Sequence, residues 1–358
     1  MPSDRKVEEP TAVTRQESIN PPNDPIGGRP RVRYAHAPVL AAQVVDGFRE
    51  HQSASVIIVD ATIGLGGHAQ RILDDLEWSH VVGVDRDRQA LASSRERLAP
   101  YGDRVRLLHG RFGDVMAVTA PLARVAGVLA DLGVSSLQLD DPGRGFSFRF
   151  DAPLDMRMDQ DGGSETVAEY LLSATPQDLV AVFRENGVGS LASRYASAIK
   201  SQPPATTGQL AEVIAAATPA RLRGGRLHPA TKVFQALRIR VNQEQEELLN
   251  FLPLAFGLLD RGGVMQVISY HSGEDRIVKR FMHLVETGGC VCPPRLGCNC
   301  GAQAVGSRMM RHALIPSEEE QKVNPRSRSA RLRMLRRTAD DISEVVQRYW
   351  EQVPSWHV

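Results

Sequence analysis

The chain has 358 residues, which is enough for two domains or for one domain with a large insertion. Its 43 Lys and Arg residues nearly balance its 42 Asp and Glu residues, so the net charge of +1 argues neither for nor against a nucleic-acid partner. No apolar run reaches the roughly 18 residues of a membrane span, and the N-terminus lacks the apolar stretch of an export signal. We therefore expect a cytoplasmic protein with no membrane partner.

Residues 1–33 are polar, rich in proline and without periodicity. Such a segment cannot bury enough apolar surface to offset the entropy lost on ordering, so we expect a disordered N-terminal tail. Its basic end, Arg31-Val32-Arg33, could contact RNA or could simply be solvated.

After the tail, short apolar runs alternate with helical patterns up to about Asp131. The expected strands are 56–60, 80–85, 105–109 and 127–131, and the expected helices are 39–48, 67–76 and 87–98. Strands that alternate with helices predict a parallel sheet covered on both faces, which is the doubly wound, Rossmann-like α/β class.

Three of these strands end in an aspartate: Asp60, Asp85 and Asp131. Because ligands of such sheets bind at the carboxyl ends of the strands, we expect the three side chains to face one crevice. Each could instead only cap the helix that follows it. The presence of three such aspartates at one edge of the sheet favours a ligand site over three separate helix caps.

The first strand runs directly into a glycine turn, in the sequence VIIVDATIGLGGH of residues 56–68. The pattern Gly64-x-Gly66-x-x-Ala69, with Asp85 21 residues beyond Gly64, fits a dinucleotide site. A methyl-donor site also has an acid at the end of the first strand, where it holds the amino-acid part of S-adenosylmethionine. Asp60 occupies that position, so the spacing favours the methyl donor and leaves the dinucleotide open.

The alternation stops near residue 136, and no convincing strand is visible before about residue 240. Helix starts are visible instead at Thr175-Pro176-Gln177-Asp178, at Thr207 and at His228-Pro229. The strand pattern resumes in VMQVIS after Gly263, a helix begins at His271-Ser272, and a last strand is expected at 330–335. We therefore predict a helical domain, 136–240, inserted after strand four of a domain formed by 34–135 and 241–340. Residues 341–358 are expected to be a C-terminal tail.

The segment 131–159 is irregular but too apolar for a linker, and long loops of this kind are usually functional. This segment and others resemble a bacterial family that methylates the 4-amino group of a cytidine in the decoding region of 16S ribosomal RNA. The similar segments, from residue 36 to about 335, are ATIGLGGH, GVDRD, HGRFGD, DLGVSSLQLDDPGRGFSFRFDAPLDMRMD, HPATKVFQALRIRVNQE, SYHSGEDRIVKRF and NPRSRSARLR.

The resemblance implies a class I methyltransferase fold with S-adenosylmethionine as cofactor and 16S rRNA of the small ribosomal subunit as partner. The cofactor contacts that it implies are Gly66, Gly67, His68, Asp85, Phe112, Asp131 and Gln138. Phe112 would lie against the adenine, although core packing is the alternative for this side chain. For His68 the alternative is a local hydrogen bond at the start of a helix.

Two residues are candidates for catalysis, and no catalytic metal is expected. Many amine-methylating enzymes have Asp-Pro-Pro-aromatic at the end of strand four, whereas this chain has Asp131-Leu132-Gly133-Val134. Asp131 could accept a hydrogen bond from the target amine or from the cofactor. His271 is the second candidate, and a structural helix cap is its alternative. The chain also departs from the family at Gly273 and at Val188-Gly189.

Two basic clusters are candidates for RNA binding, although a run of charges is often only a solvated face. They comprise Arg221, Arg223, Arg226, His228 and Lys232 in the insertion, and Arg326, Arg328, Arg331, Arg333, Arg336 and Arg337 near the last strand. The target base must leave its stack to reach the cofactor, so the loop 140–159 could shape the base pocket.

The four cysteines, Cys290, Cys292, Cys298 and Cys300, lie within eleven residues. They could hold a structural zinc ion, although the C-x-C spacing is tighter than usual, or they could be reduced loop thiols. Two further functions remain open from the sequence: an NAD-dependent oxidoreductase, and a non-catalytic RNA-binding factor of ribosome assembly.

Overall fold

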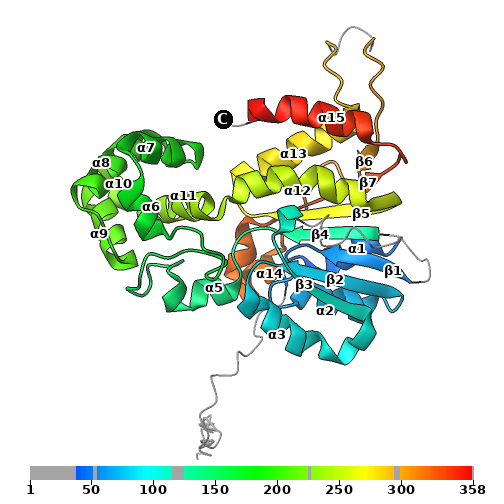
Figure 1. The fold of residues 1–358 in the computed structure, drawn as a ribbon, viewed down its shortest axis with the longest axis horizontal. Coiled ribbons are helices and arrows are strands. Elements are labelled where there is room, and N and C mark those ends of the chain that lie inside the picture. Colours follow the sequence, from blue (N-terminus) through cyan, green and yellow to red (C-terminus); the bar gives the residue numbers. More distant parts are fainter. Residues whose placement is uncertain (1–37, 51–54, 115–124, 225–226, 294–298, 357–358) are drawn as a thin grey trace, which may run out of the picture. The chain divides into compact units, whose positions relative to one another are not determined.

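Seven strands form one sheet, in the order β3-β2-β1-β4-β5-β7-β6 (Figure 1). The computed structural model describes residues 38–50, 55–114, 125–224, 227–293 and 299–356, so the predicted N-terminal tail lies outside the described residues. The strands are β1 (Val56–Asp60), β2 (Ser79–Asp85), β3 (Val105–His109), β4 (Val125–Asp131), β5 (Leu259–Ser269), β6 (Gly306–Arg308) and β7 (Arg331–Arg337). Strands β1 to β5 pair in parallel, whereas β7 runs antiparallel to both β5 and β6.

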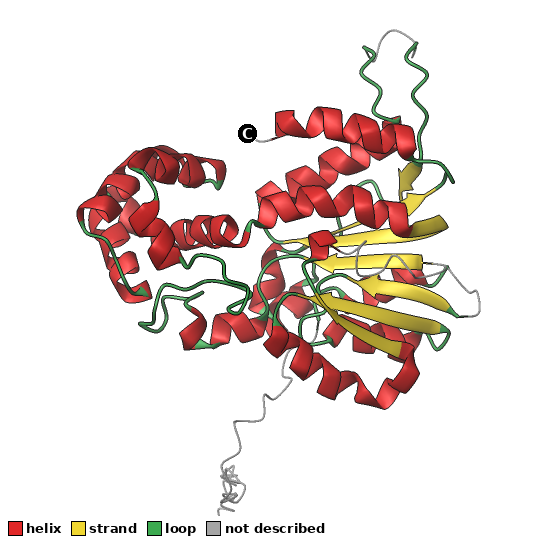
Figure 2. Cartoon of the chain, in the orientation of Figure 1, coloured by secondary structure: helices red, strands yellow, loops and turns green. Residues whose placement is uncertain are grey.

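Both faces of the sheet are apolar and covered by helices (Figure 2). Successive strand residues point to opposite faces, and Ile58 and Val59 accordingly belong to two different apolar clusters. One cluster includes residues of α1 (Ala41–Phe48), α2 (Gly67–Asp75) and α3 (Arg88–Leu98). The other includes residues of α12 (Glu244–Leu258), α13 (Ser272–Thr287) and α15 (Ser343–Gln352). The doubly wound α/β sheet predicted from the sequence is confirmed.

Between β4 and α12, the described part of 136–240 contains the helices α5 to α11 and no strand, as predicted. They are α5 (Ser136–Asp140), α6 (Val167–Ser173), α7 (Pro176–Glu185), α8 (Ala192–Ser201), α9 (Thr207–Ala217), α10 (Ala220–Arg223) and α11 (Ala230–Asn242). This segment has an apolar cluster of its own. Thr175 and Asp178 form the predicted capping box of α7, whereas α9 is capped by Thr206, one residue before the predicted position. The boundaries of the domains stay a prediction.

Outside the helical insertion, three helices of the described residues are absent from the sequence prediction. The first, α12, is apolar on most sides and carries Pro253, so its sequence shows no helical period. The second, α15, lies in the predicted C-terminal tail, where Tyr349 is fully buried and its hydroxyl donates to the carbonyl oxygen of Leu249. The third is the short α14 (Glu318–Val323). None of the helices in the described ranges has the length and apolar composition that crossing a membrane requires.

Candidate functional site

The three predicted strand-end aspartates lie on neighbouring strands at one edge of the sheet. In the register of the sheet, Asp60 pairs with Gly83 of β2 and with Leu129 of β4, two residues before Asp85 and Asp131 respectively. The parallel order β2-β1-β4 therefore brings the three carboxyl ends side by side, as the sequence predicts.

The turn between β1 and α2 has a backbone that favours glycine. Gly64 and Gly66 have φ of +51° and +76°, in the left-handed region that other residues rarely adopt. A Cβ atom at Gly66 would also lie 3.2 Å from side-chain atoms of Ser94 and Leu98, so α3 packs directly on this turn. Gly67 and His68 then open α2, and the free amides of a helix N-terminus suit a carboxylate.

Asp85 is fixed by two backbone amides. Its Oδ2 accepts from the amide of Gly64 and its Oδ1 from the amide of Asp87, both at 2.8 Å. Burial raises the pKa of Asp85 to about 6, against the effect of these two hydrogen bonds. Each oxygen keeps a further lone pair, so the carboxylate can accept hydrogen bonds from a diol.

Asp60 is buried beside two other acids. Its pKa is raised to about 7: burial is the main cause and the charges of Asp131 and Asp85 add to it, while His68 and the amide of Thr62 act in the opposite direction. Three carboxylates that resist joint ionisation at one edge form a site in which a cationic ligand is favoured.

Asp131 makes contacts that the sequence did not predict. The hydroxyl of Tyr270, the residue after β5, donates to Asp131 Oδ1 at 2.8 Å. On the other side, His68 Nδ1 lies 3.8 Å from Asp131 Oδ2, while His68 Nε2 is 2.8 Å from the carbonyl oxygen of Val39. Burial raises the pKa of Asp131, and both His68 and Tyr270 act to lower it. Tyr270 could have been found from the register, because Asp131 pairs with Ile268, two residues before it.

His271 occupies the N-cap of α13. Its Nδ1 accepts from the amide of Glu274 at 3.4 Å, and its Nε2 is 3.1 Å from Glu274 Oε1. A Cβ atom at Gly273 would lie 3.1 Å from the His271 ring, so the departure at Gly273 leaves room for this cap. These contacts support the capping interpretation, and the catalytic role of His271 stays a prediction without structural support.

Gln138 joins a buried polar network that adjoins Asp85. Its Nε2 donates to Asp87 Oδ2 at 3.0 Å, and its Oε1 accepts from the amide of Ser135. Arg144 Nη2 lies 2.9 Å from the same Asp87 oxygen, and both charged side chains are 3% exposed. Since the amide of Asp87 holds Asp85, this network connects the irregular loop after β4 to the edge that carries the acids.

Phe112 begins the short 3-10 helix η2 (Phe112–Asp114), beyond the end of β3. Its ring packs edge-on against Phe251 of α12, with centroids 5.4 Å apart. The side chain is half-buried, so core packing is established and adenine contact stays a prediction.

Most basic side chains of the two predicted clusters form ion pairs or hydrogen bonds with other groups of this chain. Arg333 pairs with Asp275, Arg326 with Asp140 and Arg336 with Glu50, while Arg337 donates to the carbonyl oxygens of Gly257 and Leu259. In the insertion, Arg223 and Lys232 donate to backbone carbonyls, and Arg226 lies outside the described residues. Arg221, Arg328 and Arg331 are exposed and can reach a phosphate. The clusters are thus partly structural.

Comparison with known families gives a match over most of the chain. A family model described as the MraW methylase family matches residues 33–338. The chain belongs to the MraW methylase family. It is 45% identical to the ribosomal RNA small subunit methyltransferase H of Syntrophotalea carbinolica, over 85% of this chain and 98% of that protein. The protein of the same name from Thermobifida fusca is 43% identical, over 86% of this chain and 94% of its own length.

This chain was also compared with solved structures. The comparison with an rRNA methylase from Streptococcus thermophilus gives a TM-score of 0.38 and 12% sequence identity, over 83% of this chain and 95% of that chain. Membership of the MraW family confirms the resemblance, the methyltransferase activity and S-adenosylmethionine as cofactor. The NAD-dependent and non-catalytic alternatives find no support. The roles of individual residues stay predictions.

Proposed function

We propose that this chain transfers a methyl group from S-adenosylmethionine to the 4-amino group of a cytidine in the decoding region of 16S rRNA. The observation that carries the proposal is the group of three acids with raised pKa values around the glycine turn, namely the buried Asp60 and the partly exposed Asp85 and Asp131. The ammonium and sulfonium groups of the donor are cationic and relieve the repulsion among these acids, whereas a dinucleotide would bring a pyrophosphate anion. The names of the relatives support a small-subunit rRNA substrate, which implies a cytoplasmic site of action.

Each residue at this edge of the sheet would contact a different part of the methyl donor. S-adenosylmethionine, when bound, supplies an electrophilic methyl group on its sulfonium. Asp60 would pair with the ammonium, the amides of Gly66, Gly67 and His68 would face the carboxylate, and Asp85 would accept from the ribose hydroxyls. Phe112 would lie beside the adenine. Gln138 would act through Asp87, which holds Asp85.

Asp131 would position the target amine. The lone pair of the cytosine amine is delocalised into the ring, so the amine is a poor nucleophile until its geometry changes. A carboxylate oxygen that accepts a hydrogen bond from the amine both aligns the nitrogen and favours this change. Tyr270 would keep the Asp131 carboxylate in place through its 2.8 Å hydrogen bond.

Methyl transfer to purified small ribosomal subunits tests this function. Subunits from cells that lack the protein are expected to gain one methyl group from tritium-labelled donor, and digestion is expected to place the label on N4 of a cytidine. Binding of the RNA with a salt-dependent affinity but without transfer would instead identify a non-catalytic assembly factor. Label on the cytosine ring carbon would exclude amine methylation.

Asp85→Ala is expected to weaken donor binding by at least about tenfold. The substitution removes the ribose acceptor and the support of Gly64, and a hydrogen bond to a charged group contributes about 1.5–3 kcal/mol. Calorimetry with S-adenosylmethionine measures the change, and Asp103→Ala, at an exposed acid of the same domain, serves as the control. An unchanged Kd in Asp85→Ala would reject the ribose assignment.

Donor affinity is expected to fall at acidic pH because of Asp60. The pKa of Asp60 is raised to about 7 in the free protein, so below pH 7 this acid is protonated and must lose its proton to pair with the ammonium. Affinity should therefore fall by up to about tenfold per pH unit below pH 7 and level off above it. Calorimetry from pH 6 to 8, in buffers of different ionisation enthalpy, measures the affinity and the released proton. Asp60→Asn should bind more weakly and with a flatter profile; a wild-type profile in this variant would assign the proton elsewhere.

A further inference from the structure

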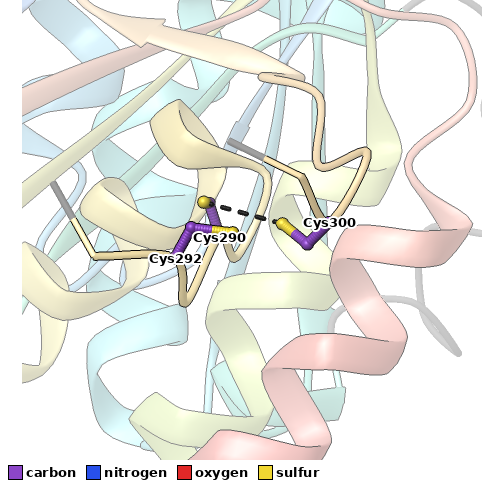
Figure 3. A group of neighbouring side chains, drawn as sticks. All are labelled: Cys290, Cys292 and Cys300. Atoms are coloured by element: carbon purple, nitrogen blue, oxygen red, sulfur yellow. Dashed lines mark hydrogen bonds between the residues drawn. The ribbon is translucent and has the colours of Figure 1, made fainter. Parts of the chain in front are cut away.

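Three of the four cysteines lie together in the loop between α13 and β6 (Figure 3). Cys290 and Cys292 follow α13, and Cys300 faces them from the part of the loop that leads to β6. The sulfur atoms of the three residues all lie within 4.8 Å of one another, and each residue is half-buried. They are far from the acids in the sequence and have no part in the proposed methyl transfer.

The backbone of this loop brings the two arms into contact. Gly288, which ends α13, has φ of +63°, and a Cβ atom there would lie 2.3 Å from the carbonyl oxygen of Gln303. Gly289 follows with φ of +70°. Two consecutive glycines thus allow the arm that carries Cys300 to pack directly against the end of α13, beside Cys290.

The distance between the sulfur atoms suits a shared metal ion. Cys290 Sγ and Cys300 Sγ are 3.6 Å apart. Tetrahedral zinc with Zn–S bonds of about 2.3 Å places its sulfur ligands about 3.8 Å from one another. A disulfide requires about 2.05 Å between the same atoms. The arrangement is therefore close to an edge of a zinc–thiolate tetrahedron, and Cys292 lies within reach of a second edge.

Arg348 of α15 complements the negative charge of such a site. Its Nη1 lies 3.9 Å from Cys300 Sγ and donates to the carbonyl oxygen of Gly288 at 3.2 Å. Residues around the ligands of a metal site commonly orient and balance those ligands in this way.

We propose that Cys290, Cys292 and Cys300 bind a structural zinc ion that joins the two arms of this loop. Thiolates are soft ligands, and a compact set of them selects zinc over magnesium or calcium. Three thiolates leave one tetrahedral position for a further ligand. Cys298 lies outside the described residues and is not counted here.

Metal analysis of the full-length chain tests the proposal without reference to methyl transfer. The wild-type protein, purified without chelator after expression with added zinc, is expected to contain about one zinc ion per chain by mass spectrometry. Cys290→Ser and Cys300→Ser are expected to contain less than a tenth of this amount, while the matched control Asn299→Ser, in the same loop, keeps it. Removal of zinc from the wild type by a chelator is expected to lower Tm and to expose the thiols to a modifying reagent.

The wild-type protein provides the decisive result even if a serine variant does not fold. A wild-type chain that neither contains zinc nor binds added Zn²⁺, and whose thiols react freely, overturns the proposal. A disulfide between Cys290 and Cys300 in protein purified from a reducing cytoplasm overturns the proposal as well. So does an equal loss of zinc from Asn299→Ser, because the loss in the cysteine variants would then not be specific to the thiols.

Discussion

Asp131→Ala is expected to lower the rate of methyl transfer at least about a hundredfold, the usual effect of removing one preorganised group that acts in the transition state. The carboxylate is held between the hydroxyl of Tyr270 and the ring of His68, so its position is set before substrate binds. The measurement is a single-turnover assay on small ribosomal subunits at saturating donor, with donor affinity determined separately by calorimetry.

Tyr270→Phe provides a graded comparison for this prediction. It removes only the hydroxyl that donates to Asp131 and leaves the ring in its packing against the sheet. We expect a smaller loss of rate, about tenfold, with donor affinity changed less than twofold. Full activity of Asp131→Ala would remove Asp131 from the reaction, whatever the result for Tyr270→Phe.

Arg144→Met is expected to destabilise the protein by about 3–5 kcal/mol, the usual cost of leaving one partner of a buried ion pair alone. Arg144 and Asp87 are each 3% exposed, and Arg144 also donates to the carbonyl oxygens of Arg157 and Met158. The methionine side chain fills similar space but neutralises none of the Asp87 charge. Chemical denaturation, followed by circular dichroism, measures the free energy of unfolding.

Arg149→Met is the matched control, because Arg149 lies in the same loop and is exposed. We expect it to change the free energy of unfolding by less than about 0.5 kcal/mol. Because Asp87 also orients Asp85, Arg144→Met should weaken donor binding at a temperature where the variant is still folded. Equal stability of the two variants would show that the buried pair contributes little.

The parallel sheet and its acidic edge were predictable from the sequence because their signals are local. β1 is a run of apolar, mostly β-branched residues that ends in Asp60 and enters a glycine turn, and β2 and β4 also end in aspartates. Parallel pairing then dictates that the three acids meet. The capping box of α7, formed by Thr175 and Asp178, was predictable from the sequence for the same reason.

The remaining features depend on tertiary contacts that no local pattern carries. Tyr270 is recognised only when β5 is placed beside β4, and Arg144 only when the loop folds over Asp87. The basic residues of β7 look alike in the sequence, yet Arg333 and Arg337 are engaged with partners distant in the chain. The C-terminal helix α15 was missed because contacts with distant elements bury it: Val345 and Tyr349 pack in the apolar cluster of the sheet, and the Tyr349 hydroxyl donates to the carbonyl oxygen of Leu249.

The nucleosides of 16S rRNA from cells that lack this protein test the central claim most directly, when measured by liquid chromatography and mass spectrometry. The account predicts that one N4-methylated cytidine of the decoding region disappears. Expression of the wild-type chain should restore it, and expression of Asp131→Ala should not. An unchanged set of methylated cytidines in the deletion strain would contradict the proposed reaction.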